Sequence, residues 1–93
     1  GGYGNFDLSG RSIGPEGLPR PIYNVQDEWL VGINILVNPE GQVINTTVNL
    51  SKTNTANPSL RKAAEDAAKK ARFNSVSGVN NQSGTITYQF NLK

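Results

Sequence analysis

The amino-acid sequence predicts an α+β fold in two layers, in which one helix packs on one face of a three-stranded antiparallel sheet. Three observations lead to this fold class. Two segments alternate apolar and polar residues with a period of two, one segment has alanines at helical spacing, and a Pro-Gly turn follows the first alternating segment. The expected order along the chain is strand, strand, helix, strand.

The first expected strand begins at Trp29. One face of this strand is apolar throughout and consists of Trp29, Val31, Ile33, Ile35 and Val37. We expect Trp29 to close the end of the core, with an exposed partner contact as the alternative. The sequence Asn-Pro-Glu-Gly at 38–41 then favours a tight turn, because proline fixes one backbone angle and glycine accepts a positive one. A weaker strand is expected to return over 42–50.

The only expected helix covers 58–73. Asn57 is a suitable N-cap, and Pro58 fits the first helical turn because its missing amide proton is not needed there. The pairs Glu65–Lys69 and Asp66–Lys70 have the favourable order for ion pairs four residues apart. The predicted buried stripe consists of small and apolar side chains, namely Leu60, Ala64, Ala67 and Ala71, with Phe73 near the helix exit. Such a stripe predicts a close approach of the helix to a flat sheet.

The last expected strand lies within 84–93 and has a regular alternation. A hairpin makes the first two strands antiparallel, and the helix returns the chain so that the last strand can lie antiparallel beside the first. The spatial order is then second, first, third, and the C-terminal strand is an edge of the sheet. An edge strand without proline, bulge or inward charge can accept another strand.

This edge is the candidate partner-binding site. Its residues are Thr85, Ile86, Thr87, Tyr88, Gln89, Phe90, Asn91, Leu92 and Lys93. Two alternatives stay open from the pattern alone. A segment of the same chain can cover the edge, for which 6–13 is the candidate, or a foreign segment can pair with it. Two copies of the chain can also pair through this strand to form a homodimer.

Domain organisation follows from composition. Residues 1–17 are rich in glycine and proline and predict a flexible leader that contains one short strand at most. The prolines at 19 and 21 predict an extended arm, and residues 18–93 form the expected domain. Because the chain starts with Gly1 and contains no methionine, we expect it to belong to a longer protein.

Composition also excludes several classes of function. The chain has neither cysteine nor histidine, which removes thiolate metal sites, the commonest metal ligand and the usual general base. We therefore expect no enzyme, no metal and no cofactor. The net charge of +2 is spread along the chain without a basic cluster, so nucleic acid is not an expected partner.

Four motifs follow one another along the chain, namely "LPRPIY", "LVGINILVNPEGQVI", "LRKAAEDAAKKARF" and "GTITYQFNLK". In this order they resemble the C-terminal domain of TonB-like energy transducers of Bacteroides-type Gram-negative bacteria, and the resemblance covers about 6–93. The resemblance implies a periplasmic domain whose parent is anchored in the inner membrane by a segment absent here. Such a parent takes energy from an inner-membrane motor complex that uses the proton motive force.

The resemblance further implies the partner and the mode of contact. A short segment of an outer-membrane receptor, the TonB box, pairs with the last strand, here 85–93, and couples the motor to import. The alternative is a TolA-like or other periplasmic assembly module that binds partners without energy transduction.

Overall fold

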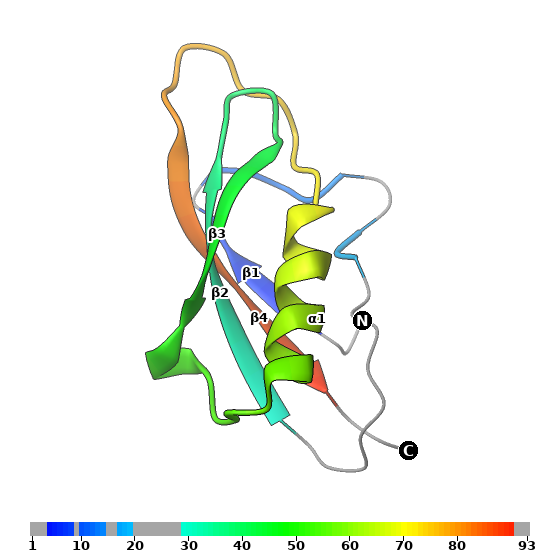
Figure 1. The fold of residues 1–93 in the computed structure, drawn as a ribbon. Coiled ribbons are helices and arrows are strands. Elements are labelled where there is room, and N and C mark those ends of the chain that lie inside the picture. The colour runs from blue at the N-terminus through cyan, green and yellow to red at the C-terminus, as the bar shows by residue number, and fades with distance from the viewer. Residues whose placement is uncertain (1–3, 9, 15–16, 20–28, 91–93) are drawn as a thin grey trace.

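The computed structural model describes residues 4–8, 10–14, 17–19 and 29–90 (Figure 1). Its elements in chain order are β1 (Gly4–Asp7), β2 (Trp29–Val37), β3 (Val43–Asn49), a short 3-10 helix η1 (Leu50–Lys52), α1 (Pro58–Lys69) and β4 (Gln82–Phe90). Figure 1 shows the helix lying along one face of a twisted sheet. The α+β class with one helix on an antiparallel sheet is confirmed.

The sheet contains four strands in the order β1-β4-β2-β3, and every neighbouring pair is antiparallel. The predicted order of the last three, with the C-terminal strand beside the first long strand, is confirmed. The predicted count of three was wrong, because β1 adds a strand outside β4. The C-terminal strand is therefore not an edge over the part that β1 covers.

The core lies between the sheet and α1. Val31, Ile33 and Val37 of β2 are fully buried, and the alternate residues of this strand face the opposite side of the sheet. Trp29 is half-buried and packs against the same core, as expected for a residue that closes its end. The period of two in the sequence thus corresponds to one buried face of β2 and one face that is more exposed to solvent.

The turn between β2 and β3 has the predicted form. The amide of Gly41 donates to the carbonyl of Asn38 at 2.9 Å, and Gly41 has a φ of 89°. The backbone of Phe73 lies directly against Gly41, and the Phe73 amide donates to the Gly41 carbonyl at 2.8 Å. Glycine is required at this position for two reasons, its backbone angle and the absence of a Cβ.

The start of α1 is also as predicted. The Asn57 side chain accepts a hydrogen bond from the Ser59 amide at 2.9 Å, and Pro58 occupies the first turn. The helix buries a stripe of one leucine and four alanines, which are Leu60, Ala63, Ala64, Ala67 and Ala68. Because alanine side chains are short, the helix axis can approach the sheet closely.

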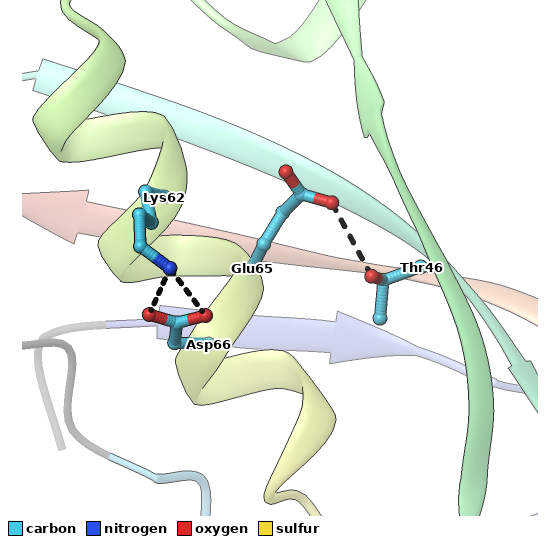
Figure 2. A network of polar contacts seen from close by, with 4 residues as sticks. All are labelled: Thr46, Lys62, Glu65 and Asp66. Atoms are coloured by element: carbon cyan, nitrogen blue, oxygen red, sulfur yellow. Dashed lines mark hydrogen bonds and ion pairs between the residues drawn. The ribbon is translucent and has the colours of Figure 1, made fainter.

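The charged residues of α1 pair differently from the prediction. Asp66 accepts from Lys62 at 3.2 Å, and not from Lys70 (Figure 2). Glu65 accepts instead from the hydroxyl of Thr46 on β3, at 3.3 Å. A carboxylate beside a neighbouring strand thus has a tertiary partner, whereas the predicted pairs considered the isolated helix alone.

The segment predicted as a leader contributes to the fold. Its described residues include β1 and the buried Leu8, while Ile13 bridges Phe73 beyond the helix. The expected short strand within 6–13 lies instead at 4–7, and the packed body begins well before residue 18. Most of the extended arm around the prolines at 19 and 21 lies outside the described residues.

Replacing Gly41 by alanine should destabilise the protein more than the same change at Gly78. Both glycines have a positive φ, 89° and 77°, so each variant loses about 1–2 kcal/mol from backbone strain. A Cβ at Gly41 meets the Phe73 carbonyl, whereas a Cβ at Gly78 meets nothing within 4 Å. Urea unfolding of both variants measures the difference, and equal losses would contradict the close contact.

Candidate protein-interaction site

Most of the predicted site residues lie on β4, and 91–93 lie outside the described residues. β4 pairs with β2 along its whole length, from Gln82 opposite Val37 to Phe90 opposite Trp29. This flank is permanently occupied by nine cross-strand partners. Any additional strand must therefore use the other flank of β4.

The two faces of β4 offer different chemistry. Ile86, Tyr88 and Phe90 point into the core, and each is 0% exposed. Thr85, Thr87 and Gln89 alternate with them and are half-buried on the face without the helix. A strand added to β4 would therefore be held by backbone hydrogen bonds, with the buried residues shaping one side of its seat.

In the structure β1 occupies that other flank. Gly4 lies opposite Tyr88 and Asp7 lies opposite Thr85, in antiparallel register. The exposed edge expected over 85–88 is therefore covered by the chain's own backbone. The sequence offered only a weak signal for this strand, because four residues that include a glycine show too little alternation to be distinguished from a loop.

Phe6 fixes β1 to the core. Its ring lies 5.3 Å from the ring of Phe73, with an angle of 72° between the planes. This is the edge-to-face arrangement that aromatic rings prefer. Asn5 and Asp7 are exposed on the opposite side of the strand. β1 therefore has one face packed against the core and one face exposed to solvent.

The end of β1 is held more firmly than its beginning. Leu8 is 5% exposed and belongs to the core. A Cβ on Gly84 would lie 2.4 Å from the Asp7 carbonyl and 2.8 Å from Leu8 Cδ1, so glycine at this position lets the two strands approach. Gly84 and Leu8 mark the point where the chain leaves β4.

Arg11 locks the chain just beyond this point and is only 8% exposed. Its guanidinium donates to the Asn74 carbonyl at 2.7 and 3.1 Å, to the Asn38 carbonyl at 3.1 Å, and to the Gln82 side chain at 2.7 Å. The rigid fork of donors suits several oxygen atoms at once. The sequence analysis did not identify Arg11, because its partners are distant in sequence and mostly backbone.

The face of the sheet opposite α1 carries a polar ladder. The side-chain oxygen of Asn34 accepts from the side-chain amide of Asn49 at 2.9 Å and from the Thr85 hydroxyl at 3.5 Å. The side-chain nitrogen of Asn34 donates to the Thr47 hydroxyl at 3.4 Å. Asn34, Thr47 and Thr85 border an open hollow of about 540 Å³ together with Asp7 and other residues. Among the described residues that line this hollow, Asp7 is the only carboxylate.

Two further tests concern metals and membranes. Among the described residues, no three His, Cys, Asp or Glu side chains gather closely enough to hold a metal ion. None of the helices in the described ranges is long and apolar enough to cross a membrane.

Comparisons of the chain with protein-family models, with curated proteins and with solved structures found no match. The resemblance to TonB-like domains therefore stays a prediction from the sequence motifs. The geometry by itself defines an α+β domain in which β4, like β2, is paired on both flanks.

Replacing Arg11 by methionine should destabilise the protein by about 1.5–3 kcal/mol, because a largely buried guanidinium loses its hydrogen bonds to Asn38, Asn74 and Gln82. Lysine at this position should recover part of the loss, since it keeps the charge but not the fork. Arg72→Met is the matched control, because Arg72 is exposed and donates only to nearby carbonyls of its own segment.

Urea unfolding gives the stabilities, and amide hydrogen exchange shows whether β1 loosens in the Arg11 variants. Equal stabilities for the Arg11 and Arg72 methionine variants would contradict the role of Arg11 in holding the segment after β1 against the loops and β4.

Proposed function

We propose that this chain is the receptor-binding domain of a TonB-like energy transducer in the periplasm. In this function an extended segment of an outer-membrane receptor pairs with β4 on the flank that β1 holds. Energy reaches the domain from the inner-membrane motor complex through other parts of the parent protein. The proposal joins the sequence motifs to one observation, the short pairing between β1 and β4.

That observation carries the proposal because the two flanks of β4 differ in extent. Among the described residues, the pairing with β2 involves nine residues of each strand, whereas the pairing with β1 involves four. Each backbone hydrogen bond contributes about 0.5–1.5 kcal/mol net. An incoming strand that replaces β1 restores the bonds that it breaks, so the exchange requires only a small excess of binding free energy.

Strand pairing also suits a protein that transmits force. Hydrogen bonds along a strand pair can share a load applied parallel to the strands. They involve the main chain, so they tolerate different receptor side chains. A domain with these properties needs no deep pocket and no catalytic group.

Because β1 is part of the same chain, it competes strongly with any receptor segment. A short flexible connection gives a tethered segment an effective concentration of the order of millimolar. Only molecules in which β1 has left β4 can bind a receptor segment, and they are a small fraction of the total. The apparent affinity is the intrinsic affinity multiplied by this fraction. Weak binding in the resting protein is therefore expected.

A second candidate function has its own support. Leu8 and Arg11 hold the segment after β1 firmly, and this firmness favours a permanent fourth strand. In that case the domain is a TolA-like or similar assembly module, and its partners bind another surface. The same consideration applies to a homodimer through the last strands, which also has to displace β1.

Phe6→Ala should raise the affinity of the full chain for a peptide from the N-terminal segment of an outer-membrane receptor. The change removes the contact of Phe6 with Phe73 and so weakens β1 without altering β4. Each 1.4 kcal/mol by which the substitution weakens the pairing of β1 with β4 should lower the dissociation constant of the peptide about tenfold. Backbone amide shifts, measured by NMR titration, should be largest over 85–90.

Val48→Ala is the matched control for general destabilisation, because Val48 is also half-buried against the core but lies on β3. The control should leave the affinity unchanged. Equal affinities of the two variants, or shifts confined to α1 and β3, would contradict strand exchange and support the assembly module. Sedimentation at several concentrations reports separately on dimers.

A further inference from the structure

We infer that the flank of β4 selects an incoming strand with the pattern small, polar, aromatic, polar, running antiparallel to β4. This inference rests on the proposed function, because it describes the segment that replaces β1. It follows from the space that each residue of β1 fills. Two positions face the core side of β4, and two face the polar side of the sheet.

The first core-side position, opposite Tyr88, accepts only a small residue. Gly4 lies there, and a Cβ on Gly4 would lie 3.2 Å from the Thr87 carbonyl and 3.2 Å from Tyr88 Cδ1. The Tyr88 ring is fully buried and cannot shift without disturbing the core. Alanine is tight at this position, and a branched side chain does not fit.

The second core-side position, opposite Ile86, favours an aromatic ring. Phe6 fills it and meets the ring of Phe73 edge to face. Ile86 is 0% exposed and Phe73 is 5% exposed, so the walls of this seat are fixed parts of the core. A segment without an aromatic ring leaves a cavity against Phe73 when it replaces β1.

The two remaining positions favour polar residues. Asn5 and Asp7 are exposed, and Asp7 borders the hollow next to Asn34 and Thr85. A slip of one residue would place the aromatic ring over this polar ladder and a polar side chain against Phe73. Strand register is strongly specified when only one face is buried, so the pattern also fixes the register.

The exchange has a defined limit and direction. Leu8 is buried beside Gly84, and Arg11 is held by the loops and by Gln82, so the seat ends at the residue opposite Thr85. An incoming segment therefore ends its pairing one residue after the aromatic ring. Its preceding residues run past Tyr88 toward the carboxyl end of β4.

The test uses the full-length Phe6→Ala chain, in which β1 competes weakly, and four synthetic peptides of equal length. The matched peptide contains Gly-Asn-Phe-Asp at its centre. The second has the order Phe-Asn-Gly-Asp, in which no antiparallel register puts a glycine opposite Tyr88 and the ring opposite Ile86. The third has valine for glycine, and the fourth has alanine for phenylalanine. NMR titration gives the affinities and the shifts of β4 amides and of the Phe73 ring.

The matched peptide should bind at least tenfold more tightly than each of the other three, and it alone should shift the Phe73 ring strongly. A fifth peptide with leucine for phenylalanine tests the ring contact. In a Phe6→Ala/Phe73→Leu chain, the preference for phenylalanine over leucine should fall by about two- to tenfold, the value of an edge-to-face pair.

The outcomes separate the pattern from the proposed function. Equal affinities of the first four peptides, with shifts along β4, would overturn the pattern and leave strand exchange intact. The same holds if a receptor segment that lacks the pattern binds β4 as tightly as the matched peptide. If neither the matched peptide nor any receptor segment shifts the β4 amides, strand exchange fails together with the pattern.

Discussion

The central position of β4 is the constraint on which the rest of the structure depends. Its core side supplies Ile86, Tyr88 and Phe90, and each of its flanks carries a strand. β2 and the amino-terminal strand β1 both pair with it, while β3 and the helix contact the sheet on the side of β2. Since, among the described residues, the pairing with β2 spans nine residues and that with β1 four, β4 has one strongly paired and one weakly paired flank.

Local sequence signals were sufficient for most of the fold. The alternation from Trp29 to Val37, the turn at 38–41 and the cap at Asn57 each depend on residues that are neighbours in sequence. Such features have recognisable patterns because the backbone geometry and the side chain that stabilises it lie together. The order of the three long strands then followed from connection lengths alone.

The parts that the sequence did not reveal depend on distant partners. β1 has only four residues, and its stability comes from Phe73, which lies 67 positions after Phe6. Arg11 likewise binds carbonyl groups of loops that no local pattern places near it. Glu65 likewise accepts a hydrogen bond from Thr46 on another element, which a pattern confined to the helix does not reveal. The predicted site residues 85–90 lie on β4, and the sequence left open whether a segment of the same chain covers this strand; the structure places 4–7 there.

The position of Arg11 in the chain imposes an order of mechanical yielding. Tension that enters on the amino-terminal side reaches β1 first, where four residues pair with β4, and reaches Arg11 only afterwards. There the side chain engages two loops and the start of β4 at the same time, so several bonds must break together. Under such tension β1 can therefore separate from β4 while the contacts of Arg11 still hold the rest of the sheet and the helix in place.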